Sequence, residues 1–162
     1  MQDFVHLHVH TQYSLLDGQA SVSRLVDKAM KDGMKGIAVT DHGNMFGIKE
    51  FTNYVNKKNS GPKGEIKDLK KRIAGIESGE IECEDKEAEI ADCRAKMAEA
   101  ESKLFKPIVG CEMYVARRTM DKKEGKPDQS GYHLIVLAKN EKGYHNLIKL
   151  VSLSLIHISE PT

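Results

Sequence analysis

The sequence lacks the features that mark membrane proteins and secreted, disulfide-linked proteins. No apolar run approaches the roughly 20 residues of a membrane-spanning helix, and the charged, histidine-rich start has no apolar signal core. The 3 cysteines are odd in number and form no CxxC pair, which argues against a disulfide framework or a zinc knuckle. A net charge of +1 gives no global attraction to nucleic acid, so any DNA contact must come from a local patch. We therefore expect a cytoplasmic protein with free thiols and no membrane partner.

The composition that remains is that of an ordinary soluble protein. With 162 residues, of which 40% are apolar and 30% charged, the chain can hold one domain with a modest core. Ser21 can cap a helix over residues 22–30, the short apolar run 36–40 predicts a buried strand, and a second helix is predicted over residues 44–58. Two βα units in a row predict an α/β fold with a parallel sheet or barrel.

Residues 59–106 differ from the rest because they are highly charged and carry two heptad-like apolar stripes. The stripes are separated near Ser78-Gly79, which predicts an antiparallel helical hairpin. Such a hairpin could be a docking arm for a partner or for DNA, but we favour an insertion that packs on itself. Cys83 and Cys93 lie on the apolar seam and are interpreted as small core residues.

The most informative feature is a run of alternating histidines near the start. In a strand over residues 4–10, His6, His8 and His10 share one face, and the apolar residues between them share the other. An isolated HxH is typical of an edge strand with a solvated polar face. Here Asp17 follows, and His42 comes just after the buried strand 36–40. Imidazole and carboxylate are the ligands that Zn, Mn or Fe prefer, so the pattern predicts a metal site.

A later strand, residues 107–115, places a carboxylate in apolar surroundings. Glu112 needs a partner there because an unpaired buried charge is costly. That partner could be a metal ion or a neighbouring Lys or Arg, and the residues alone leave both open. A charged, glycine-containing loop, residues 117–131, leads to another strand, 133–138, which begins with His133. Asn140 can then cap a final helix.

Four segments in this order carry a resemblance to a known family: HLHVHTQYSLLDG, AVTDHGNMFG, PIVGCEMYV and YHLIVLAKN. Together they closely resemble the polymerase and histidinol phosphatase (PHP) domain over about residues 4–154. More narrowly, they resemble the PHP domains at the amino terminus of bacterial replicative DNA polymerases. The resemblance implies part of a distorted (βα)7 barrel, with an inserted helical hairpin and a metal cluster at the carboxyl ends of its strands. The expected divisions are 1–58 and 107–154 for the PHP domain, 59–106 for the hairpin and 155–162 for a divergent tail, which is a candidate sequence artefact.

The resemblance also assigns site residues by position. It implies two or three divalent ions, with Zn, Mn and Fe as the candidates. Asp41 is interpreted as orienting a ligating imidazole, whereas His6, His145 and His157 match no ligand position. The implied metal ligands are His8, His10, Asp17, His42, Glu112 and His133.

Such a cluster would support phosphoester hydrolysis by an activated water, without a protein nucleophile. In a polymerase the expected activity is a 3'-5' proofreading exonuclease, acting on a DNA 3' end beside the remainder of the polymerase and the replisome subunits. Pyrophosphate removal is the other activity that such a site would support. The alternatives are a free-standing phosphoesterase of the histidinol phosphatase kind and a non-catalytic structural module. The later barrel strands and the polymerase carboxylates of the family have no counterpart in this chain. We therefore expect the chain alone to be inactive, and unstable or aggregated.

Overall fold

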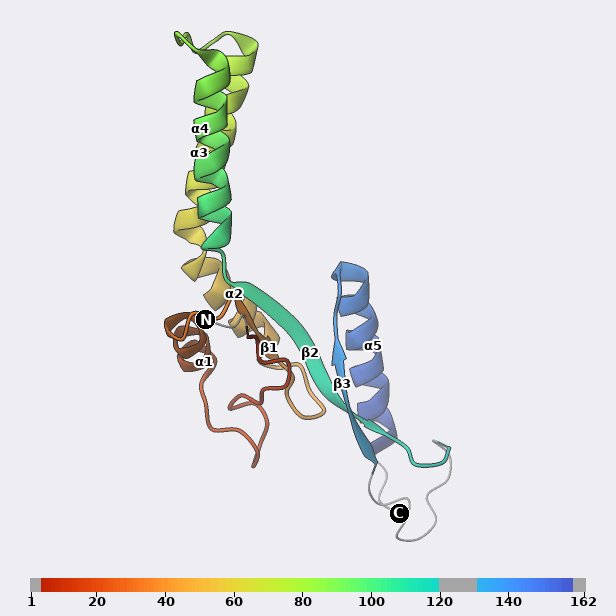
Figure 1. The fold of residues 1–162 in the computed structure, drawn as a ribbon. Coiled ribbons are helices and arrows are strands. Elements are labelled where there is room, and N and C mark those ends of the chain that lie inside the picture. Colours follow the sequence, from red (N-terminus) through yellow and green to blue (C-terminus); the bar gives the residue numbers. More distant parts are fainter. Residues whose placement is uncertain (1–3, 120–130, 159–162) are drawn as a thin grey trace. The chain divides into compact units, whose positions relative to one another are not determined.

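The computed structural model describes residues 4–119 and 131–158 of the chain and shows an α/β fold, as predicted. None of the described helices is both long and apolar enough to cross a membrane. The described elements are α1 (Val22–Lys31), β1 (Gly36–Val39), α2 (Ile48–Lys58), α3 (Ser60–Ser78), α4 (Lys86–Ser102), β2 (Lys106–Val115), β3 (Tyr132–Leu137) and α5 (Glu141–Ile158) (Figure 1).

The chain divides into two compact units. One comprises Met1–Tyr54 together with Pro107–Thr162, and the other comprises Val55–Lys106. Of the predicted tail 155–162, residues 155–158 continue α5, and residues 159–162 lie outside the described residues, as does most of the predicted loop 117–131.

The sheet of the first unit has the strand order β1-β2-β3. Just beyond β1, His42 forms a parallel bridge with Glu112 of β2, in which the Glu112 N–H donates to the Asp41 carbonyl and the Gly43 N–H donates to the Glu112 carbonyl. The expectation of a parallel sheet is wrong for β2 and β3, which pair antiparallel from Gly110↔Leu137 to Val115↔Tyr132. These two strands follow one another in the chain, and a direct return places the end of one opposite the start of the next.

The strand predicted over residues 4–10 is not a regular strand. The segment runs beside β1, where the Ala38 N–H donates to the His6 carbonyl and the Thr40 N–H donates to the Val9 carbonyl. These donors are two residues apart and their acceptors three, so the histidine segment holds one extra residue, as in a β-bulge. The Val9 N–H donates instead to the Thr40 hydroxyl at 2.9 Å, which interrupts the ladder.

Two apolar layers support the sheet. Val22 and Val26 of α1 are fully buried, and β1 is buried along its whole length. Leu147 and Val151 of α5 pack with Cys111 of β2. The predicted cap of α5 is confirmed, because the Asn140 side chain accepts from the Gly143 N–H at 2.9 Å. Ser21 stands at the predicted start of α1, but its side chain makes no capping hydrogen bond.

The second unit contains the two predicted hairpin helices, α3 and α4, which pack against one another. Gly79 ends α3 in a left-handed conformation (φ 80°), which glycine adopts without strain. The buried side chain of Asn59 joins the two ends of the unit, donating to the Phe105 carbonyl at 2.8 Å and accepting from the Phe105 N–H at 2.9 Å. Cys93 of α4 is buried, in line with its interpretation as a core residue, whereas Cys83 lies between α3 and α4 and is only half-buried.

Candidate metal centre

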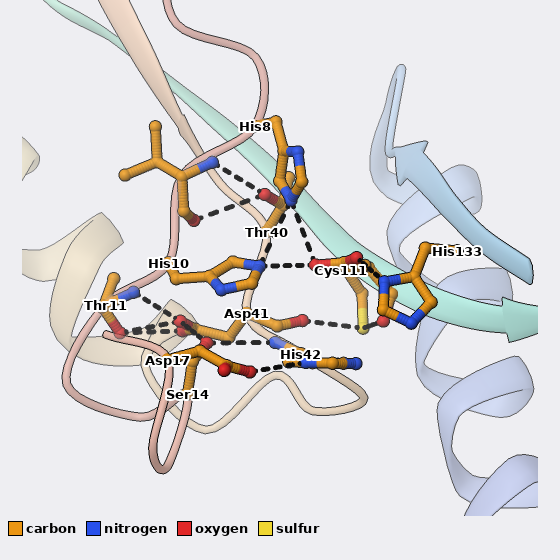
Figure 2. A network of polar contacts seen from close by, with 12 residues as sticks. His8, His10, Thr11, Ser14, Asp17, Thr40, Asp41, His42, Cys111 and His133 are labelled. Carbon is orange, nitrogen blue, oxygen red and sulfur yellow. Dashed lines mark hydrogen bonds and ion pairs between the residues drawn. The ribbon is translucent and has the colours of Figure 1, made fainter. Parts of the chain in front are cut away.

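The buried carboxylate of Glu112 is the point at which the predicted site residues meet. Its Oε2 lies 3.0 Å from Nε2 of His8 and 2.5 Å from Nε2 of His10, and its Oε1 lies 2.5 Å from Nδ1 of His133. His8 and His10 come from the segment beside β1, and His133 is the second residue of β3 (Figure 2). Among the described residues, the ion-pair partners of Glu112 are therefore imidazoles, not the Lys or Arg that the sequence left open.

His42 has a different environment on its two ring nitrogens. Nδ1 lies 2.7 Å from Oδ2 of Asp17. A dashed line marks this contact in Figure 2. Nε2 is buried and has no hydrogen-bond partner among the residues that the structure describes. Because a carboxylate only accepts hydrogen bonds, the Asp17 contact places the proton of a neutral ring on Nδ1 and leaves a lone pair on Nε2. A buried polar atom without a partner is costly, and a metal ion would satisfy this one.

Asp41 differs from its predicted role as a residue that orients an imidazole. Its buried carboxylate accepts from the Thr11 N–H at 2.6 Å, from the Thr11 hydroxyl at 2.8 Å and from the Ser14 hydroxyl at 2.7 Å. Ser14 Oγ in turn accepts from the His42 N–H at 3.0 Å. Asp41 thus holds the loop before Asp17 against the backbone of His42, and Asp17 is the carboxylate that contacts the ring.

Thr11, Ser14 and Tyr114 are three residues of this site that the sequence did not single out. The Tyr114 ring lies 4.7 Å from that of His42 and 4.9 Å from that of His133, measured between ring centroids. A signal for Tyr114 was available, because it stands two residues after Glu112 and so lies on the same face of the strand. Thr11 and Ser14 gave no such signal, since their importance depends on a contact with Asp41 about 30 residues away.

The electrostatics of the site favour an ionised Glu112. Burial by itself raises the pKa of this carboxyl, but the hydrogen bonds and charges of His8 and His10 together outweigh burial, and the pKa lies below its usual value. On the neighbouring residue, burial and then the charge of Asp41 raise the pKa of the Cys111 thiol to about 11. The face of β2 with Glu112 therefore carries a charged acceptor, and the face with Cys111 carries a neutral thiol.

Two overlapping groups of side chains have the composition and spacing of metal ligands. One is His8, His10 and Glu112, and the other is His42, Glu112 and His133; in each, the three candidate ligand atoms lie within 4.8 Å of one another. The Nε2 atoms of His8 and His10 are only 3.2 Å apart. Converging imidazole nitrogens around a carboxylate are a typical donor set for Zn, Mn or Fe, so the residues fit a divalent ion.

Two of the remaining histidines stand apart from these two groups. His6 packs edge-on against Phe4, and His145 is exposed on α5 near Glu141, as expected of residues that match no ligand position. The side chain of His157 lies outside the described residues.

Comparison with known proteins links this arrangement to one family. A family model described as "PHP domain" matches residues 6–161. The chain is 39% identical over 154 residues to the DNA polymerase III subunit alpha of Borreliella burgdorferi, and 38% identical over 154 residues to that of Treponema pallidum. It is 32% identical over 159 residues to that of Aquifex aeolicus. Each match covers 94% of this chain, which spans only about a tenth of the length of these relatives.

Proposed function

The chain belongs to the PHP domain family, and on that premise we propose that it is the amino-terminal part of a bacterial replicative DNA polymerase whose PHP domain hydrolyses phosphoesters. The DNA polymerase III alpha subunits to which it is similar are DNA-synthesising enzymes by name, which supports the assignment of the parent protein. Residues 1–58 and 107–154 would form part of a distorted (βα)7 barrel, and residues 59–106 an inserted hairpin.

The observation that carries this proposal is the buried, unpartnered Nε2 of His42 beside a carboxylate shared by three other imidazoles. His8 and His10 would hold one divalent ion with Glu112, and His42 and His133 would hold a second with the other oxygen of Glu112. Asp17 would either join as a ligand or fix the ring of His42. Bound Zn, Mn or Fe ions, two or three in number, would activate water and offset the charge that develops on phosphorus.

The surrounding residues would hold the ligand side chains in place and leave room for a phosphoester substrate. The loop held by Asp41 fixes the backbone of His42, and the rings of Tyr114, His42 and His133 restrict one another. An open hollow of about 660 Å³ adjoins His8, His10 and Asp17 and extends to the side chains of α1. This volume is in the range that holds a nucleotide-sized ligand. The substrate would be the 3' end of a DNA strand, and the activity a 3'-5' proofreading exonuclease of the cytoplasmic replication machinery.

The test is metal content and 3'-exonuclease activity of the full-length protein, compared with its His8→Ala and Glu112→Ala variants. We expect both variants to lose at least one ion per molecule by elemental analysis and to lose exonuclease activity. His145→Ala is the matched control, because it removes an exposed imidazole from α5 and should change neither quantity. Unchanged metal content in both variants would reject the ligand assignment. Metal loss without any nuclease activity in the wild type would instead favour the structural module.

A further inference from the structure

The hairpin of the second unit carries strongly segregated charge. Residues 57–72 contain seven Lys or Arg and two acidic residues, whereas residues 77–92 contain eight acidic residues and one Lys. The net charge of the whole chain hides this contrast. Because the net charge of the chain is close to zero, attraction to nucleic acid would have to come from a local basic patch.

Four lysines of α3 gather on one face of that helix. At about 100° per residue, Lys63, Lys67, Lys70 and Lys71 fall within an arc of roughly 100°, and the acidic residues of α3 nearest to them fall outside it. All four side chains are exposed, and with Ile66 and Ala74 they line a shallow hollow of about 560 Å³. We call Lys63, Lys67, Lys70 and Lys71 the lysine face.

The lysine face is not neutralised by the hairpin's own acids. Lys63 donates to the neutral amide oxygen of Asn56, and no ion pair between described residues involves any of the four lysines. On α4, by contrast, Lys96 pairs with Asp92 at 2.6 Å and Lys103 pairs with Glu99 at 2.7 Å. Like charges four residues apart, such as Lys63 and Lys67 or Lys67 and Lys71, destabilise a helix, so a bound polyanion would reduce the repulsion within α3.

From this placement we propose that the lysine face binds the phosphate backbone of a nucleic acid duplex. Its ends, Lys63 and Lys71, are eight residues apart, which corresponds to roughly 12 Å along the helix axis. The same length of B-DNA carries about seven phosphate charges. No aromatic side chain lines the hollow of the lysine face, so it offers no surface on which an unpaired base could stack. The neighbouring carboxamide of Asn56 accepts a hydrogen bond from Lys63, so the contact to nucleic acid is to the backbone and is independent of sequence. The site is separate from the candidate metal centre and does not depend on its activity.

The first test is amine footprinting of the full-length protein in EDTA, with and without a 20-base-pair DNA duplex. We expect the duplex at low salt to reduce acylation of Lys67, Lys70 and Lys71 several-fold, and added salt to remove this protection. Lys96 and Lys103 are the internal control, because they are exposed on the same hairpin and already paired with carboxylates. Because EDTA excludes metal-dependent hydrolysis, this result does not depend on the proposed phosphoesterase.

The second test is the salt dependence of duplex binding by fluorescence anisotropy, for the wild type and a Lys67→Gln, Lys70→Gln, Lys71→Gln variant. Loss of three phosphate contacts should reduce the slope of log K against log salt by about 2–3 and lower the affinity at least about tenfold at low salt. An Arg94→Gln, Lys96→Gln, Lys103→Gln variant removes the same charge from α4 and should bind like the wild type. The proposal is overturned if the duplex does not reduce acylation of the lysine face, or if the two triple variants lose the same affinity for the duplex. It is also overturned if polyglutamate or anionic lipid vesicles reduce the acylation as much as the duplex does.

Discussion

At the residue scale, Glu112 organises the site because both of its oxygens meet imidazoles. His8 and His10 approach one oxygen and His133 approaches the other, so one carboxylate is shared between two candidate ligand groups. Asp17 and Asp41 have separate tasks around His42: Asp17 contacts its ring, and Asp41 acts on its backbone through Ser14. The two acidic residues are therefore not interchangeable, although each lies close to His42.

Asp17→Asn in the full-length protein tests the role of the contact with His42. The asparagine amide can donate as well as accept a hydrogen bond, so it no longer favours the His42 tautomer that is protonated on Nδ1. A smaller fraction of the rings then has a lone pair on Nε2 with which to bind metal. We expect metal affinity to fall by about 10–100-fold, measured by competition with a chelator. Asp32→Asn, which removes a carboxylate paired with Lys28 on the surface, should leave affinity unchanged. Equal affinities of Asp17→Asn and wild type would remove Asp17 from the site.

Cys111 provides a prediction about pH. Because burial raises the pKa of its thiol to about 11, alkylation of folded protein at pH 8 should spare Cys111 and modify the half-buried Cys83, as followed by peptide mass spectrometry. The unfolded chain releases the same proton near pH 9, so the free energy of unfolding should fall as the pH rises from about 9 to about 11. Rapid modification of Cys111 at pH 8 without unfolding would contradict its burial.

At the element scale, β2 is the strand that places Glu112, and its packing leaves little room for change. A methyl group at Gly110 would lie 2.7 Å from the Val136 carbonyl oxygen, 2.7 Å from Leu137 and 2.9 Å from Thr40. Both neighbouring strands approach this position, so glycine is required by close packing and not by an unusual backbone angle. The spacing between β2 and the segment after β1 is what brings His42 beside Glu112.

Gly110→Ala should therefore destabilise the fold by about 1–3 kcal/mol and reduce metal content as well, since the clash displaces the strand that carries Glu112. Thermal or urea unfolding together with elemental analysis measures both effects. Gly64→Ala is the control, because nothing lies within 4 Å of the added carbon in α3. Alanine there should be neutral or stabilise by up to about 1 kcal/mol. Equal free energies of unfolding for the two variants would refute the predicted clash at Gly110.

At the scale of the whole molecule, the first unit leaves a considerable apolar surface uncovered. β3 stands at the edge of the described sheet, with Tyr132 and Leu134 more than half exposed. On α5, Leu150 and Leu153 are also about half exposed. An unpaired strand edge beside apolar side chains is a template for association between copies.

The 162-residue chain on its own should therefore form oligomers or aggregates at micromolar concentration, as size-exclusion chromatography with light scattering would show. Its thermal transition should be weakly cooperative and should sharpen when divalent metal is added, because bound metal stabilises the folded state. A monomer that melts cooperatively at the same temperature with and without EDTA would refute this expectation.

Several parts of the fold and site could be predicted from local sequence. The apolar runs of β1, β2 and β3 and the periodicity of the helices depend on neighbouring residues, and these elements lie close to their predicted bounds. The six candidate ligands were found through motifs and family resemblance, and the structure brings four of them, His8, His10, His133 and Glu112, into direct contact. Their role as ligands stays a prediction until metal is measured.

What the sequence by itself determined is thus the set of elements and the chemical types of the site residues, because periodicity and side-chain chemistry are local properties. Only the tertiary structure decided the irregular path of residues 4–10, the antiparallel return of β3 and the partners of Asp17 and Asp41. Each of these depends on which backbone groups and side chains meet across the sheet. The extra residue beside β1 illustrates the reason: the Val9 N–H donates to the hydroxyl of Thr40, 31 positions away, a contact that the local pattern could not reveal.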